Sequence, residues 1–71
     1  MNEIVFEVQN DPDGGYVAKS KLEKGSIITQ GDTILELKEM IKDAVEGYFF
    51  DKPTQKPKSV HLHFEEVFAL A

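Results

Sequence analysis

The first apolar side chains of the sequence alternate with polar ones. Ile4, Phe6 and Val8 fall on one side of an extended backbone, and the intervening positions include glutamates. A period of two is the pattern of a strand with one buried face. We therefore predict a strand over residues 3–8.

Two more strands are expected next. The sequence Asp-Pro-Asp-Gly-Gly at residues 11–15 combines a proline with glycines that tolerate positive φ, which favours a hairpin turn. Alternation then predicts a strand over residues 16–21. A Glu-Lys-Gly turn at residues 23–25 leads to a β-branched stretch, which predicts a third strand over residues 26–30. Neighbouring strands joined by short turns pair antiparallel in the simplest topology.

A helix is predicted to start at Thr33. The sequence Thr-Ile-Leu-Glu matches a capping box, in which the Thr33 hydroxyl and the Glu36 carboxylate satisfy free amide groups. Apolar residues then recur at spacings of three and four, as on the buried face of a helix. They are Ile34, Leu37, Ile41, Ala44 and Tyr48. Because Pro53 disfavours helical backbone just before it, we expect the helix to end near residues 50–51.

The last predicted element is a strand near the end of the chain. Val60, Leu62 and Phe64 alternate with two histidines after a basic, proline-marked connector at residues 52–58. A strand that follows a helix commonly pairs parallel to an earlier strand. The chain is therefore predicted to form a single α+β domain over residues 1–71: a three-stranded antiparallel sheet, one helix and a fourth strand, in the order β-β-β-α-β.

The charge balance is acidic. The 71 residues include 13 Asp and Glu against 8 basic residues, all of them lysine, for a formal net charge of -5. Nucleic-acid binding by this chain alone is disfavoured, because phosphate neutralisation needs clustered basic side chains. The absence of cysteine excludes disulfides, thiolate metal sites and a cysteine nucleophile. No apolar run approaches the roughly 18 residues of a membrane span, and no signal-peptide pattern is recognisable, so we expect a cytoplasmic protein that does not bind membranes.

One short pattern suggests metal chemistry. His61, His63 and Glu65 alternate along the last predicted strand, so three possible ligands share one face, as in zinc sites built on strands. A polar, solvent-facing side of a strand gives the same pattern without a metal. We name these three residues as candidate ligands, and we expect no metal or other cofactor.

Catalysis is a further possibility that the acidic residues raise. The order β-β-β-α-β also opens the ribonuclease H fold, whose members hydrolyse phosphodiesters with a carboxylate-bound divalent metal. A hydrolase on this scaffold is expected to use Glu7 with carboxylates from the helix and the last strand. The order alone does not convey the activity, and the sequence has neither a nucleophile signature nor a phosphate-binding loop. We therefore expect no catalytic residues, with the metal-dependent hydrolase as the alternative.

Three successive aromatic residues end the predicted helix. Neighbouring helical residues point about 100° apart, so at least one of Tyr48, Phe49 and Phe50 must face solvent or a partner. We assign Phe50 and Phe68 to self-association as a dimer or tetramer. The apolar residues 67–71 are expected to extend the sheet, cover the core or dock on another subunit.

Several motifs occur in a fixed order along the chain. They are an Asp-Pro-Asp-Gly-Gly-Tyr-Val-Ala hairpin at residues 11–18, a Thr-Gln-Gly-Asp-Thr helix entry at residues 29–33, and the helical residues 36–38 and 41–46. In this order and at these separations they resemble the HicB-like family, over nearly the whole chain. The resemblance implies a truncated ribonuclease-H-like fold with three antiparallel strands, a helix and a fourth strand.

The resemblance also implies a non-catalytic antitoxin. HicB-like proteins bind a small basic HicA toxin, which resembles a double-stranded RNA-binding domain and cleaves messenger RNA. We expect Glu3, Glu7, Glu65 and Glu66 to contact such a partner, since an acidic surface complements a basic one. Longer relatives append a DNA-binding module that this sequence does not show, so direct DNA binding is not expected. The remaining alternative is a structural domain that binds only itself.

Overall fold

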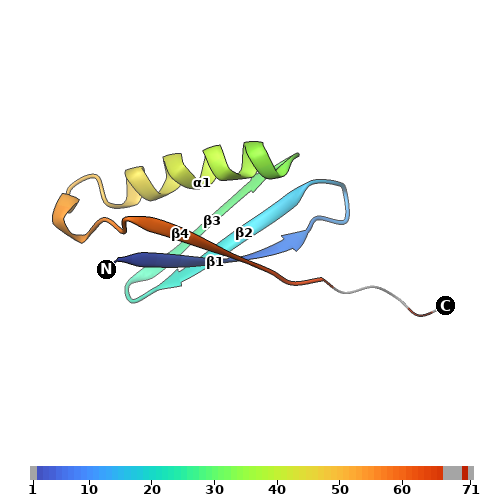
Figure 1. The fold of residues 1–71 in the computed structure, drawn as a ribbon, viewed down its shortest axis with the longest axis horizontal. Coiled ribbons are helices and arrows are strands. Elements are labelled where there is room, and N and C mark those ends of the chain that lie inside the picture. The colour runs from blue at the N-terminus through green and yellow to red at the C-terminus, as the bar shows by residue number, and fades with distance from the viewer. Residues whose placement is uncertain (1, 67–69, 71) are drawn as a thin grey trace.

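One helix lies across one face of a four-stranded sheet in the computed structural model of the chain, which describes residues 2–66 and 70 (Figure 1). The strands are β1 (Glu3–Asn10), β2 (Tyr16–Leu22), β3 (Gly25–Gly31) and β4 (Ser59–Phe64). Helix α1 (Ile34–Tyr48) follows β3, and the short 3-10 helix η1 (Pro53–Gln55) precedes β4. The predicted α+β fold and its β-β-β-α-β order are confirmed, with each of the first three strands one or two residues longer than predicted.

The strand order in the sheet is β3-β2-β1-β4. The first three strands pair antiparallel, whereas β4 lies parallel to β1 on the other side of it. In this parallel pair Ile4 is opposite Val60 and Phe6 is opposite Leu62. The helix between β3 and β4 provides the long connection that a parallel partner requires. As a result, β3 and β4 are the two edge strands.

The turn between β1 and β2 has the predicted hairpin chemistry. The Asp11 carboxylate accepts a hydrogen bond from the Asp13 amide at 2.8 Å, and the Gly14 amide donates to the Asp11 carbonyl oxygen at 2.9 Å. Gly14 and Gly15 have φ angles of 105° and 80°, which a side chain would strain. The two glycines therefore allow the reversal that starts β2.

Helix α1 begins with the predicted cap. Thr33 Oγ1 accepts a hydrogen bond from the Glu36 amide at 3.1 Å, and Glu36 Oε1 accepts one from the Asp32 amide at 3.0 Å. The second bond reaches one residue further back than in the usual capping box. The helix ends at Tyr48, before the predicted end near residues 50–51, because later amides bond three residues back and tighten the backbone. Within the described residues, no helix is long and apolar enough to cross a membrane.

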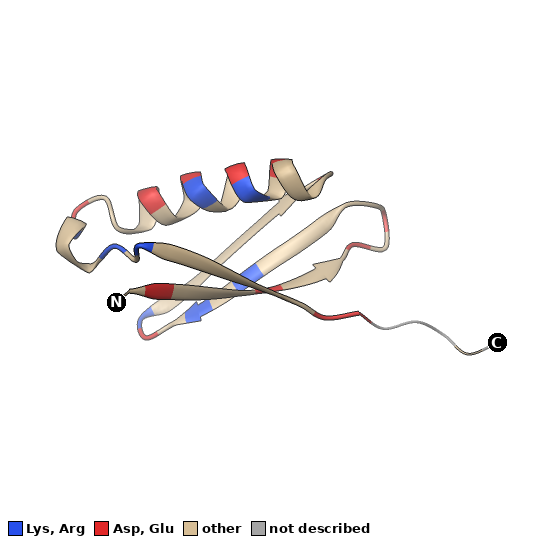
Figure 2. Cartoon of the chain, viewed as in Figure 1, with Lys and Arg blue, Asp and Glu red and all other residues tan. Residues whose placement is uncertain are grey.

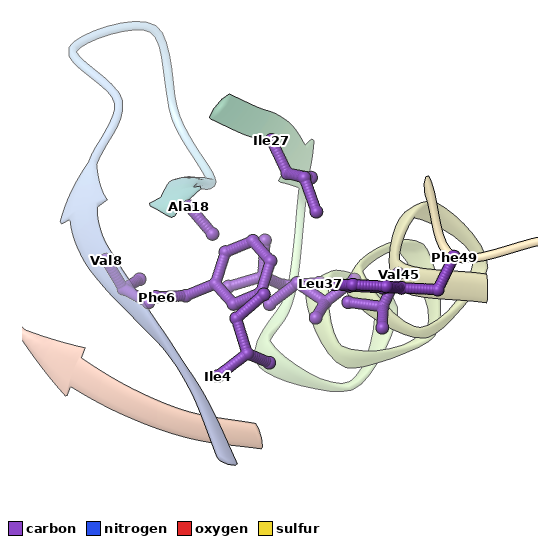
Figure 3. Close-up of a cluster of buried hydrophobic side chains, with 9 residues drawn as sticks. Ile4, Phe6, Val8, Ala18, Ile27, Leu37, Val45 and Phe49 are labelled. Carbon is purple, nitrogen blue, oxygen red and sulfur yellow. The ribbon is translucent and has the colours of Figure 1, made fainter. Parts of the chain in front are cut away.

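The core lies between α1 and the sheet (Figure 3). Its buried side chains are Ile4, Phe6, Val8, Ala18, Ile27, Leu37, Ile41, Val45 and Phe49. Leu37 and Ile41 are buried as the helical stripe predicts, and Val45 takes the third helical position. These three residues follow a spacing of four, which keeps one line of side chains against the sheet. The other predicted stripe residues are half-buried: Ala44 and Tyr48 pack against the core, and Ile34 lies in the first turn of the helix.

Helix α1 is offset from β4. It packs against β3 and β2. Both α1 and β4 lie within the described residues, and no Cα atom of one is within 8 Å of a Cα atom of the other. The helix-side residues of β4 are therefore left partly uncovered. Val60 is 41% exposed, Phe64 is 52% exposed and Leu62 is half-buried. This offset exposes an apolar strip along one edge of the sheet.

Candidate functional site

The sheet face opposite α1 carries a row of side chains that crosses all four strands. His63 on β4 is opposite Glu7 on β1, Glu7 is opposite Lys19 on β2, and Lys19 is opposite Ile28 on β3. His63 Nδ1 lies 2.6 Å from Glu7 Oε2. The four residues are exposed, and Glu7 and Lys19 place opposite charges side by side in this row.

Three of the predicted partner-binding carboxylates gather where β1 and β4 end. Gln9 Nε2 donates a hydrogen bond to Glu65 Oε2 at 3.0 Å, and a shallow hollow of about 200 Å³ is lined by Gln9, Asn10, Glu65 and Glu66. Glu7 lies two residues before Gln9 on the same face of β1, about 7 Å along the strand. We call Glu7, Glu65 and Glu66 the acidic patch. All three residues are exposed.

Glu3 does not belong to the acidic patch. It is opposite Ser59 at the start of the β1 and β4 pair. Four residues of extended chain separate it from Glu7, a distance of about 13 Å along β1. The structure therefore divides the four predicted glutamates into a group of three and one separate residue.

The predicted metal ligands do not form a cluster. Among residues 2–66 and 70, no group of three or more His, Cys, Asp or Glu side chains is arranged to hold a metal ion. His63 contacts Glu7 across the sheet, Glu65 contacts Gln9, and His61 is opposite the apolar Val5. The described structure therefore does not assemble His61, His63 and Glu65 into a metal-holding group.

The carboxylates expected for a hydrolase are also divided by the sheet. Ile4, Phe6 and Val8 of β1 point into the core beneath α1, so Glu7 points to the opposite face. Carboxylates on α1 lie beyond the other face of the sheet. A two-metal site needs carboxylates that converge on ions about 3.5–4 Å apart. The combination of Glu7 with helix carboxylates is therefore not assembled in this fold.

A second surface feature lies between α1 and β4. It is a groove of about 320 Å³ whose apolar lining includes Ile41, Val45, Val60 and Leu62. Four lysines line it as well, and we call it the lysine groove: Lys38 and Lys42 come from α1, and Lys56 and Lys58 come from the connector before β4. Figure 2 shows lysine positions on α1 and on the connector that leads into β4.

One acidic residue partly balances the lysine groove. Glu46 Oε1 forms an ion pair with Lys56 Nζ at 3.4 Å, and both side chains are about half exposed. Four lysines and one glutamate thus line this surface of a chain whose net charge is -5. The two surface features have opposite charge and lie at opposite ends of β4 (Figure 2).

Sequence reasoning missed the lysine groove, although a signal was present. Lys38 and Lys42 are one helical turn apart, and Lys56 and Lys58 are separated by one residue. Each pair therefore projects toward one side of its own segment. Only the packing of α1 on β2 and β3 shows that the two pairs face the same groove.

The aromatic residues after α1 divide as expected. Phe49 is 5% exposed and belongs to the core, whereas Phe50 is 85% exposed. The Tyr48 and Phe49 rings make an edge-to-face contact with centroids 4.9 Å apart. The prediction that at least one ring faces solvent is confirmed for Phe50. Phe68, the other predicted self-association residue, lies outside the described residues.

Comparison with known proteins places the chain in a family. Over 64 residues it is 50% identical to a UPF0150 protein of Thermotoga maritima, a match that covers 90% of this chain and 84% of that protein. The chain belongs to the UPF0150 family. Another UPF0150 protein, from Archaeoglobus fulgidus, is 42% identical over 55 residues, covering 78% of this chain and 76% of the relative.

Two other comparisons gave no match for this UPF0150 protein. No family model matches the sequence, and no solved structure matches it. A function for this UPF0150 protein is therefore inferred from its two exposed surfaces, the acidic patch and the lysine groove.

Proposed function

We propose that this UPF0150 protein is a non-catalytic, HicB-like protein-binding domain. Its role is that of an antitoxin, which neutralises a small basic HicA-type messenger RNA interferase in the cytoplasm. Support comes from the element order, which is the one that the HicB-like resemblance implies. Two of the motifs that carry the resemblance also have clear structural roles, as the β1 to β2 turn and as the cap of α1.

The acidic patch is the observation that carries this proposal. Glu7, Glu65 and Glu66 are exposed, and the hydrogen bonds of Glu7 and Glu65 each use one carboxylate oxygen. A basic RNA-binding protein presents lysine and arginine side chains to phosphates. Carboxylates held on a sheet can occupy the same surface, and complementary charge speeds the encounter. The antitoxin then acts by covering the RNA-binding surface of the toxin.

The first experiment is co-expression with a small lysine-rich, histidine-containing protein encoded in the neighbouring reading frame. We expect the two proteins to copurify as a complex and the UPF0150 protein to relieve growth arrest caused by its neighbour. If no such neighbour exists, or if the two proteins do not associate, the antitoxin proposal is wrong. A chain that associates only with itself would favour the structural-domain alternative.

A charge-reversal variant tests the surface itself. Glu7→Lys, Glu65→Lys and Glu66→Lys together should weaken toxin binding by at least about tenfold, because several close charge pairs are lost. The matched control reverses three exposed carboxylates elsewhere, Glu23, Glu39 and Asp43, and changes the net charge equally. Equal weakening by both variants, measured by calorimetry, would show that net charge rather than the acidic patch drives binding.

A further inference from the structure

The outer edge of β4 is open to another strand. β4 pairs with β1, and the Glu65 amide continues this pairing with a 2.8 Å bond to the Val8 carbonyl oxygen. In such a strand, the backbone N–H and C=O groups of one residue point to the same side, and those of the next residue point to the opposite side. The backbone groups of Val60, Leu62 and Phe64 therefore point away from β1. Within the part of the chain that the structure describes, no strand pairs with this edge. An open edge is a template for pairing with a second chain.

The side chains of the β4 edge lack the usual protection against pairing. No proline or lysine lies between Ser59 and Phe64, although these residues are what commonly blocks an edge strand. On the helix side, Val60 and Phe64 are 41% and 52% exposed, since α1 does not cover them. Pairing this edge would bury apolar surface as well as backbone groups.

Charge is distributed unevenly along β4 and its flanking residues. Lys56 and Lys58 precede the strand, and Glu65 and Glu66 follow it (Figure 2). Parallel pairing of two copies would place like charges side by side. Antiparallel pairing places the lysines of each copy next to the glutamates of the other. The other edge strand, β3, is preceded by Glu23 and Lys24 and followed by Asp32, so its two ends differ less in charge than those of β4.

We propose that β4 pairs antiparallel with β4 of a second copy of this chain, around a twofold axis at Leu62. The two four-stranded sheets then form one continuous sheet of eight strands. Val60 of each copy is opposite Phe64 of the other, so the exposed apolar strips meet on the helix side. Lys58 of each copy is opposite Glu66 of the other. A twofold interface repeats each contact, so both pairs occur twice.

The same arrangement brings opposite charges together beside the lysine groove. Lys58, which lines the groove, is opposite Glu66 of the second copy. This inference does not depend on toxin binding, because sedimentation of the chain alone, without a toxin, tests it.

The first test compares two lysine substitutions by sedimentation velocity of the full chain. We expect the unaltered chain to be a dimer, and Phe64→Lys to weaken dimerisation by at least about tenfold, because it places charge in the apolar strip. Ile28→Lys is the matched control, since Ile28 is 63% exposed on β3, the other edge strand. Circular dichroism confirms that both variants fold. A monomeric unaltered chain, or dissociation by Ile28→Lys alone, would overturn the proposal.

A charge exchange tests the antiparallel direction. Lys58→Glu and Glu66→Lys should each weaken the dimer, because each creates two like-charge contacts across the twofold axis. The double variant restores opposite charges and should recover most of the affinity. Neither residue is in the core, so loss of folding does not explain the singles. If the double variant is as weak as the sum of the singles, Lys58 does not face Glu66 of the second copy.

Spin labels give an independent measure of the arrangement. The chain has no cysteine, so a single introduced cysteine carries the only label. Labels at His61 should lie on adjacent strands, whereas labels at Ile28 are separated by seven strand spacings, about 34 Å. Dipolar spectroscopy measures both separations. A shorter separation at Ile28 than at His61 would place the interface on β3 and contradict the proposal.

Discussion

His63 and Glu7 form a short contact that links β4 to β1. The two residues are directly opposite in the parallel register, and His63 Nδ1 lies 2.6 Å from Glu7 Oε2. Their side chains are 60% and 52% exposed. Water and salt therefore screen the interaction, and exposed pairs of this kind contribute little to folding. The geometry leaves Glu7 available to a partner protein rather than committing it to the fold.

The first prediction concerns Glu7→Gln. We expect the free energy of unfolding to change by no more than about 0.5 kcal/mol, because the pair is exposed and the amide oxygen can still accept a hydrogen bond. Affinity for a basic partner should fall, since one carboxylate of the acidic patch is lost. Urea denaturation and calorimetry measure the two quantities. A loss of stability above about 2 kcal/mol would assign Glu7 a structural role instead.

The second prediction concerns the cap of α1. Thr33→Ala removes the oxygen that accepts the Glu36 amide and should lower the free energy of unfolding by about 1 kcal/mol. Thr54→Ala is the control, because Thr54 is exposed in η1, which has no side-chain cap. Thermal melting of both variants provides the comparison. If both melt like the unaltered chain, the hydroxyl of Thr33 does not stabilise the helix.

The third prediction concerns the close approach of β3 to α1. A Cβ atom on Gly31 would lie 2.6 Å from the Leu37 amide nitrogen and 2.8 Å from its Cα atom, and both are backbone atoms that cannot rotate away. Gly31→Ala should therefore destabilise the fold by about 1–3 kcal/mol through overpacking. Gly25→Ala is the matched control at the other end of β3, where a Cβ atom would have no neighbour within 4 Å.

The outcome of this comparison is read from urea denaturation midpoints. We expect Gly25→Ala to stay within about 0.5 kcal/mol of the unaltered chain, as surface substitutions usually do. Similar midpoints for the two variants would mean that α1 moves away from β3 at little cost.

The secondary structure could be predicted because it depends on local patterns. Ile4, Phe6 and Val8 show the period of a strand, and Thr33 with Glu36 shows the start of a helix. These signals depend only on neighbouring residues. The end of α1 was predicted too late because the nearest proline, Pro53, marks only the last position that a helix can reach. The backbone turned earlier, where amides began to bond three residues back.

The surfaces were harder to predict because they depend on how elements pack. Nothing in the spacing of Lys38 and Lys56 shows that a helix and a connector face one groove. The spacing of His61 and His63 shows that they share a strand face, but it does not show that His63 is opposite Glu7 and His61 is opposite Val5. Strand register, which a single sequence does not determine, decides which residues meet.

The last prediction separates two neighbouring aromatic residues. Phe49→Ala should lower the free energy of unfolding by about 3 kcal/mol, because Phe49 is buried against the core. Phe50→Ala should change it by less than about 0.5 kcal/mol, since its ring is 85% exposed. Because a domain of this size has a small total stability, Phe49→Leu provides a milder variant if Phe49→Ala does not fold.

A Phe50 variant also shows which of two surfaces holds the predicted dimer, the end of α1 or the edge of β4. If Phe50 contributes to it, Phe50→Ala weakens the dimer in sedimentation experiments while its melting temperature stays unchanged. If β4 pairing alone holds the dimer, Phe64→Lys dissociates it and Phe50→Ala does not. Dissociation by Phe50→Ala together with a resistant Phe64→Lys would move the interface to the end of α1. The stability and sedimentation measurements are independent, so a folding defect cannot be mistaken for loss of the interface.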